Sequence, residues 1–178
     1  MANTQKITLG SGHIYIMEYD STQGIPTDDV LEVEDNLLGH IQGGAVLKYE
    51  PEFYNVSCDC GEVKQTFLTK ESVTLSSGVL TWNANTLGRI CSTARVTEDA
   101  LTGKRSVKIG GLTNYVDKTY VIRFKHLNNG TKTTIVGNNT TGFEFAYAPD
   151  KETVVNVEFT AKSMDNEGTL VEFTEPIE

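Results

Sequence analysis

The chain has 178 residues, with 15 Lys and Arg against 24 Asp and Glu, and a formal net charge of −9. A chain of this length suits one domain that buries roughly 70% of its unfolded surface and needs no disulfide or metal to hold it together. The acidic balance argues against a protein that grips nucleic acid, because such proteins usually carry a basic surplus that displaces counterions from phosphates.

The charges are unevenly distributed along the chain. Residues 8–46 contain seven acids and no Lys or Arg, and the last fourteen residues contain five acids and no base. The bases gather in the middle, at Arg89, Arg95, Lys104, Arg105, Lys108, Lys118, Arg123, Lys125 and Lys132. Acidic ends around a basic centre suit head-to-tail association of identical copies, although a solvated surface of mixed charge is the simpler interpretation.

The N-terminus is polar and lacks the apolar run of a signal peptide, and no stretch of the sequence is long and apolar enough to cross a membrane. The protein is therefore expected to be made in a cytoplasm and to have no membrane partner. Three cysteines cannot all pair, and in a reducing compartment they are expected to be thiols.

The first part of the chain predicts an arm, a strand and a long loop. Residues 1–12 read as an arm that ends in a glycine-rich break, and residues 13–19 alternate well enough for a strand. Residues 20–35 are polar and are interrupted by Gly24 and Pro26, which disfavours a regular element. We expect a long loop there, with a turn of helix after Thr27. The three glycines of residues 39–44 indicate a tight bend or a close backbone approach.

The rest of the chain is organised around residues 38–96, which predict three strands and a helix. The first strand is expected to be half buried, because apolar and polar residues alternate there, with Ala45, Leu47, Tyr49 and Phe53 on the apolar face. A break rich in turn residues follows, and then strands over residues 63–69 and 72–80.

From Asn83 onward the apolar residues are spaced three and four apart, which predicts a helix of about three turns. Asn83 or Asn85 can cap its first turn. Gly88 weakens this helix by about 1 kcal/mol unless close packing requires the missing side chain.

The second half reads as a series of short strands. They are expected over residues 106–109, 118–127, 131–136, 143–147, 153–162 and 168–174. Asn128-Asn129-Gly130 is a strong hairpin signal between the second and the third of these. Eight or more short strands with one helix predict a mainly β fold, an antiparallel β-sandwich or barrel with one short α-helix, and the chain reads as a single domain over residues 1–178.

No residue pattern points to an enzyme, a metal or a cofactor. Cys58 and Cys60 lie close together in sequence, but zinc needs four ligands and the histidines fall in separate elements, at His13, His40 and His126. His126 lies in phase with the apolar face of its strand, so a core or capping role is expected, as is core packing for Cys91. Nucleophile elbows and phosphate-binding glycine loops are missing from the sequence.

Two other functions remain open on the residues alone. A hydrolase in the acidic loop would use carboxylates such as Asp28 and Glu32, although neighbouring acids in a polar loop are usually solvated. A carbohydrate- or peptide-binding sandwich would display aromatic side chains, but Trp82 stands at a strand-to-helix junction where burial is expected.

Four segments of the central block resemble the major tail tube proteins of long-tailed bacteriophages, especially those that infect Gram-positive bacteria. They are LGHIQGGA at residues 38–45, LKYEP at 47–51, GVLTWN at 78–83 and residues 87–96. The resemblance implies a β-sandwich subunit with one helix, which forms six-fold rings whose strands join into a continuous barrel around a lumen. The rings stack into a tube that conducts DNA, and the protein has no enzymatic activity.

The resemblance also implies which segments make contacts between rings. These are the N-terminal arm over residues 1–12, the C-terminal tail over residues 172–178, and a stacking loop. The stacking loop comprises Tyr54, Asn55, Val56, Ser57, Cys58, Asp59, Cys60, Gly61 and Glu62. Polar strand faces would line the channel, and the candidates to face the lumen are Lys48, Glu50, Glu52, Lys64 and Thr66.

The implied partners are further copies of the chain, a tape-measure protein, and tail-terminator or distal tail proteins. Phage DNA would pass through without specific binding, in the virion, after assembly in the cytoplasm of the bacterial host. Similar subunits form the inner tubes of tailed bacteriocins and secretion-type injection systems, which the sequence does not separate from a phage tail.

Overall fold

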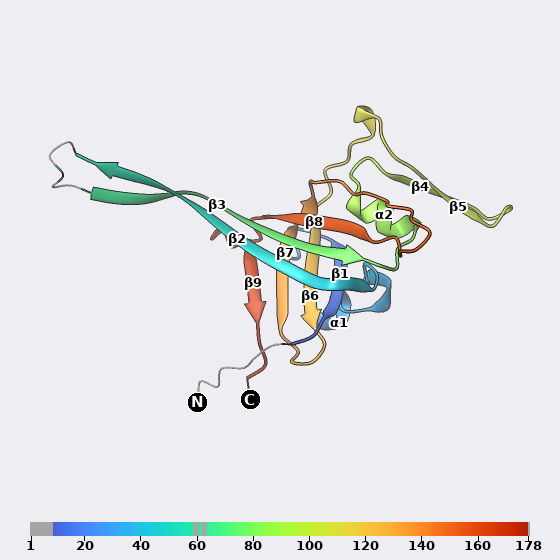
Figure 1. The fold of residues 1–178 in the computed structure, drawn as a ribbon, viewed down its shortest axis with the longest axis horizontal. Helices are drawn as coiled ribbons and strands as arrows, with labels where there is room; N and C mark the ends of the chain where they lie inside the picture. Colours follow the sequence, from blue (N-terminus) through green and yellow to red (C-terminus); the bar gives the residue numbers. More distant parts are fainter. Residues whose placement is uncertain (1–8, 59–60, 62–63, 178) are drawn as a thin grey trace.

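The computed structural model describes residues 9–58, 61 and 64–177, and it is a mainly β molecule (Figure 1). The strands are β1 (Gly12–Glu18), β2 (Ile41–Ser57), β3 (Lys64–Val79), β4 (Arg95–Asp99), β5 (Lys104–Lys108), β6 (Tyr120–His126), β7 (Lys132–Asn139), β8 (Val155–Lys162) and β9 (Val171–Thr174). The helices are α1 (Asp28–Leu31) and α2 (Ala84–Ile90), with 3-10 turns η1 (Glu34–Asn36) and η2 (Leu112–Asn114). The expected mainly β class is confirmed, and α1 is the expected turn of helix after Thr27.

One antiparallel sheet forms the body, in the order β1-β6-β7-β8-β3-β2. β8 and β9 follow one another along the same edge of β7, because β8 pairs with residues 136–139 and β9 with residues 132–135. The sheet is curved: the ring of His13 on β1 lies 6.1 Å from that of His40, just before β2. β4 and β5 form a separate hairpin that extends away from the body (Figure 1).

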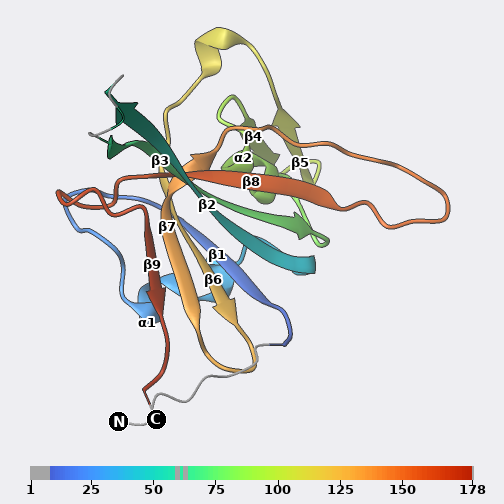
Figure 2. The ribbon, with the colours of Figure 1, turned by 60° about the vertical axis from the view of Figure 1, so that its left-hand side comes forward.

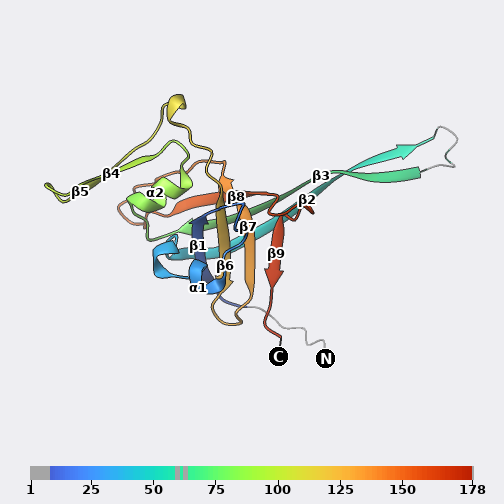
Figure 3. The same ribbon diagram turned by 180° about the vertical axis from the view of Figure 1, so that it is seen from behind.

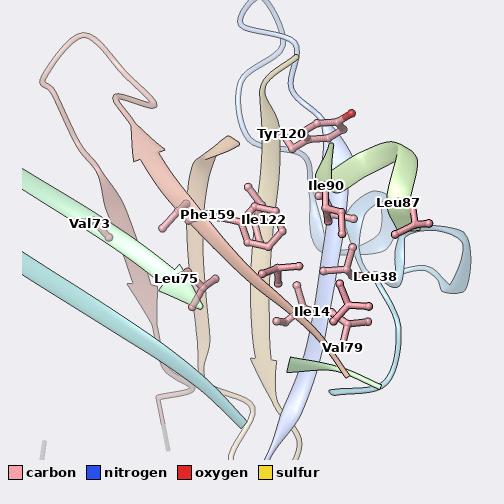
Figure 4. Close-up of a cluster of buried hydrophobic side chains, with 14 residues drawn as sticks. Ile14, Leu38, Val73, Leu75, Val79, Leu87, Ile90, Tyr120, Ile122 and Phe159 are labelled. Atoms are coloured by element: carbon pink, nitrogen blue, oxygen red, sulfur yellow. The ribbon is translucent and has the colours of Figure 1, made fainter. Parts of the chain in front are cut away.

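The main core fills the concave side of this curved sheet, and α2 covers it (Figure 4). Its buried side chains come from β1, β3, β6, β7 and β8, while β2 adds only partly buried residues at its start. Phe159 of β8, Ile122 of β6 and Ile14 of β1 are fully buried. Leu87 and Ile90 are the positions through which α2 joins this core, as their spacing of three predicts.

A second, smaller core lies on the opposite side of the sheet. Leu31 of α1 packs there with Val121 of β6 and Val136 of β7. Figure 2 shows the ribbon of α1 beside these strands. The middle strands are therefore covered on both sides, which is why β6 begins with four consecutive buried residues. The alternation of β6 correctly placed Tyr120 and Ile122 on one face, but it gave no sign that the other face is also covered.

Asn83 caps α2, as its position before the apolar repeat predicts. Its Oδ1 accepts from the backbone N–H groups of Asn85 (2.8 Å) and Thr86 (3.2 Å), and the Thr86 hydroxyl accepts from the Asn83 N–H (3.3 Å). The helix is shorter than expected and ends at Ile90. Gly88 is where close packing requires a glycine, because a Cβ there would lie 2.9 Å from Val96 of β4.

Removing this cap should destabilise the protein measurably. We expect Asn83→Ala to lower the free energy of unfolding by about 1 kcal/mol, because two backbone donors lose their acceptor. Asn85→Ala, in the first turn of the same helix, should change it by less than about 0.5 kcal/mol, because the Asn85 side chain accepts no hydrogen bond from the helix end among the described residues. Urea unfolding followed by circular dichroism measures both, and equal effects of the two substitutions would contradict the capping role.

The strands of the structure differ from the expected ones in three ways. The strands expected over residues 63–69 and 72–80 are one continuous strand, β3, interrupted only by a bulge. Residues 143–147 form no strand, because Phe143 and Phe145 pack instead against the core and the ring of Trp82. β4 occupies residues that follow the helix and that showed no strand signal, and it exists because β5 pairs with it.

Candidate assembly surface

The hairpin of β2 and β3 extends far beyond the body of the molecule (Figures 1 and 3). β3 pairs with β8 only over residues 74–79, whereas it pairs with β2 over its whole length. β2 is the last strand of the sheet, and among the described strands it pairs with β3 alone. One edge of a 17-residue strand is thus left without a partner strand.

Two irregularities shape this hairpin. Gly43 and Gly44 form a bulge in β2 with φ values of 81° and 78°, a conformation that side-chain-bearing residues rarely adopt. The second irregularity lies at Thr69 of β3, where Glu52 pairs with Lys70 and the next residue, Phe53, pairs with Leu68. Bulges of this kind bend a strand and increase its twist, so they set the direction in which the hairpin leaves the body.

Large apolar side chains are exposed along the hairpin. Their exposed fractions lie between 40% and 61%, and the set comprises Val46, Leu47, Tyr49, Phe53, Tyr54, Val56, Phe67 and Leu68. The expectation of a half-buried strand is therefore wrong for the single chain at Tyr49 and Phe53, because no layer formed by the described residues covers the hairpin there. We call these eight residues the apolar hairpin surface.

The residues that were expected to face the lumen lie on two opposite faces of the hairpin. Lys48, Glu50 and Glu52 share one face, and ion pairs join Lys48 to Glu50 (2.7 Å) and Glu52 to Lys70 (3.3 Å). Lys64 and Thr66 lie on the opposite face, because the bulge at Thr69 reverses the alternation of β3 relative to that of its partner. Thr66 donates a hydrogen bond to Asn55 there (2.7 Å).

The stacking-loop candidates lie at the far end of the hairpin. Residues 54–57 are the last four of β2, and Cys58 follows the strand. Gly61 has a positive φ of 73°, a conformation that glycine adopts readily. Cys58 is disulfide-bonded, which corrects the expectation of thiols, while Cys91 is a free thiol. The candidates Asp59, Cys60 and Glu62 lie outside the described residues.

The predicted arm and tail are both partly attached to the body. Of residues 1–12, the structure describes Leu9 onward, and the Leu9 carbonyl accepts a hydrogen bond from Asn128 (2.9 Å). Residues 172–174 belong to β9 and pair with β7, so the free part of the tail begins after them. Ile177 is 86% exposed. Residues 1–8 and Glu178 lie outside the described part of the chain.

A cluster of five charged side chains fixes the loop that carries α1 against β6 and β7. Glu32 lies 2.5 Å from Lys125, 2.9 Å from Lys132 and 3.3 Å from Arg123. Asp28 lies 2.6 Å from Arg123 and also pairs with Lys132. The side chains of Glu32 and Arg123 are only 7% exposed. We call these five residues the charge cluster.

The bases keep both carboxylates of this cluster ionised. Burial by itself would raise the pKa of Glu32, but the hydrogen bonds and charges of Lys125 and Lys132 outweigh it and hold that pKa below its ordinary value. The hydrogen bond from Lys132 is the largest cause that lowers the pKa of Asp28. Carboxylates held in this way are suited to fastening a loop and poorly suited to donating a proton.

Sequence reasoning missed the charge cluster, and a usable signal was present. Arg123 and Lys125 alternate with the apolar residues Ile122 and Phe124, so the face that they share needed either water or acidic partners. The acidic loop that precedes β2 supplies those partners from about 90 positions away. His126 is buried as expected, and its Nδ1 accepts from the N–H of Asn128 (3.2 Å).

Within residues 9–58, 61 and 64–177, no group of three or more His, Cys, Asp or Glu side chains is arranged to hold a metal ion. Each helix of the same residues is too short or too polar to span a membrane.

Comparisons with known proteins find similarity among solved structures only. No protein-family model and no curated protein matches the chain. Among solved structures, the chain is similar to one described as the virion of a native gene transfer agent (GTA) particle. The two share 11% sequence identity, the match covers 90% of this chain and 95% of that chain, and the TM-score is 0.46. A likeness of this size assigns no function to the chain.

Proposed function

We propose that the chain is a structural subunit of a bacteriophage virion, and more specifically of the tail tube, and that it works by assembling with copies of itself. The observation that carries this proposal is the β2–β3 hairpin, with its unpaired 17-residue edge strand and the apolar hairpin surface. The resemblance of residues 38–96 to phage tail tube proteins supports the same function.

The physics of an exposed strand favours assembly. An unpaired edge presents a row of backbone N–H and C=O groups that readily pair with another chain, and soluble proteins normally cover or charge such edges. A two-stranded hairpin without a packing layer is also marginally stable in water. Identical neighbours would meet both needs at once, by pairing the edge and covering the apolar side chains.

In this proposal six copies form a ring and the rings stack into a tube that conducts DNA. The face of Lys48, Glu50 and Glu52 would turn toward the lumen, where ion pairs within the hairpin keep its basic side chains from holding phosphates. Tape-measure, tail-terminator and distal tail proteins would meet the ends of the tube. DNA would pass without specific binding, and the subunit would have no enzymatic activity.

The test is electron microscopy of the purified protein with a variant of the hairpin. We expect the wild type to form rings or hollow rods at high concentration. Phe53→Ser together with Leu68→Ser should abolish them. These cross-strand partners are 57% and 52% exposed on the face opposite the one proposed to line the lumen, so their loss removes contact area without disturbing the core.

Leu127→Ser is the matched control, since Leu127 is 58% exposed but lies in the β6–β7 turn, away from the hairpin. It should assemble like the wild type. A wild type that stays monomeric under all conditions would overturn the proposed function and favour a ligand-binding sandwich. Rods formed equally well by the hairpin variant would show that this hairpin is not the assembly surface.

A further inference from the structure

The β4–β5 hairpin separates its charges by face. Val96 pairs with Val107 and Glu98 with Arg105 on the face toward α2, where Glu98 and Arg105 form an ion pair (2.6 Å). The register places Arg95, Lys104 and Lys108 together on the other face. All three are exposed, and within the described residues none of them has an ion-pair partner.

The one acidic residue of β4 and β5 on that basic face, Asp99, is engaged in hydrogen bonds within the hairpin. Asp99 accepts hydrogen bonds from the N–H groups of Leu101 (3.0 Å) and Thr102 (3.4 Å) and from the Thr102 hydroxyl (2.8 Å), so it closes the turn of the hairpin. The turn also holds Leu101 with its side chain 98% exposed. The hairpin thus presents three bases that lack an ion pair among the described residues, beside an apolar tip. It extends away from the body (Figures 1 and 3).

The segment of α1 and η1 has the complementary composition. Asp28 and Glu32 are used in the charge cluster, but Asp29, Glu34 and Asp35 are exposed and have no ion-pair partner among the described residues. Between them Val30 and Val33 are 47% and 40% exposed. The charge cluster fixes the α1–η1 segment to the body. This segment is therefore a preorganised acidic surface with an apolar centre.

We propose that the basic face of the β4–β5 hairpin docks on the α1–η1 segment of a second copy of the chain, with Leu101 against Val30 and Val33. This inference rests on the proposed self-assembly and adds a second contact to it. Three bases meet three acids, and an apolar tip meets an apolar centre. The two surfaces are different, so the contact is head-to-tail and can close a ring or extend a tube.

A charge-swap series tests the contact in the assembling protein. Lys104→Glu with Lys108→Glu should slow assembly at least tenfold, and Glu34→Lys with Asp35→Lys should do the same, because each brings like charges together. A chain that carries all four substitutions should recover assembly. Light scattering measures the rates, and electron microscopy shows whether the particles match those of the wild type.

Site-specific cross-linking identifies the partner surfaces directly. Leu101→Cys and Val33→Cys are introduced into separate Cys91→Ser chains, which are mixed, assembled and treated with a short bismaleimide. A cross-linked pair of the two chains is expected. Leu127→Cys in place of Leu101→Cys should give no cross-link with Val33→Cys, although Leu127 is also exposed.

The outcomes separate this inference from the proposed function. Normal particles without the cross-link, or charge reversals without effect, would overturn the second contact and leave tube assembly standing. If reversal of the bases alone impairs assembly and the swap gives no rescue, the basic face binds something other than the α1–η1 segment, and the inference is wrong. A wild type that never assembles would overturn both.

Discussion

Replacing Glu32 by Gln is expected to lower the free energy of unfolding by about 3 kcal/mol at neutral pH, because it removes the buried carboxylate that compensates three bases. The Glu32 side chain is 7% exposed and lies within 3.3 Å of Arg123, Lys125 and Lys132. Asp28 remains, but its side chain is 61% exposed and is not within 4 Å of Lys125. Urea unfolding of the monomer at pH 7 measures the loss.

Glu34→Gln is the control in the same acidic segment. Glu34 is exposed and has no ion pair among the described residues, so its substitution should change stability by less than about 0.5 kcal/mol. Equal stability of the Glu32→Gln variant and the wild type would contradict a stabilising role for the charge cluster.

The pH dependence has a definite sign. The pKa of Glu32 is lower in the folded state than its ordinary value, so its stabilising contribution is complete above the ordinary range near pH 4.3 and is lost as the pH falls through the lowered value. The stability difference between wild type and Glu32→Gln should therefore be largest at neutral pH and shrink below about pH 4. A difference that stays constant down to pH 3 would mean that the carboxylate charge is not its cause.

Phe159→Ala should be about as destabilising, with an expected loss of about 3–5 kcal/mol. Phe159 is fully buried in the middle of the main core, on the strand that joins β7 to β3. Truncation removes its apolar surface from the core and leaves a cavity that the paired strands around it cannot collapse to fill.

Phe173→Ala is the matched substitution on the surface. Phe173 lies on β9 and is 61% exposed, so its truncation should cost less than about 1 kcal/mol. Denaturant unfolding of both variants gives the comparison. A loss below 1 kcal/mol for Phe159→Ala would mean that the interior near β8 repacks, which the described close packing does not allow.

The two sets of contacts have different roles. The charge cluster and the main core hold the body together within one chain, while the apolar hairpin surface and the basic face of β4–β5 are left for other molecules. Variants of the first set should therefore lower stability, and variants of the second should impair assembly while the monomer stays folded. This separation makes the proposed function testable without confusing it with unfolding.

Most of the individual elements could be predicted from the sequence. The alternation in β1 and β6, the Asn-Asn-Gly turn before β7, and Asn83 as the cap of α2 are local properties of the chain, and the structure confirms them. They are predictable because a residue's direction in a strand and the capping of a helix end depend on neighbours a few positions away.

Only the tertiary structure decided which faces of those elements are covered. The sequence by itself determined that Arg123 and Lys125 oppose Ile122, but the acids that neutralise them come from a distant loop. It determined that Tyr49 and Phe53 alternate with polar residues, yet the fold leaves both uncovered because the β2–β3 hairpin runs past the sheet. Alternation fixes the direction of a side chain within its own strand, whereas burial depends on what a remote segment places against it.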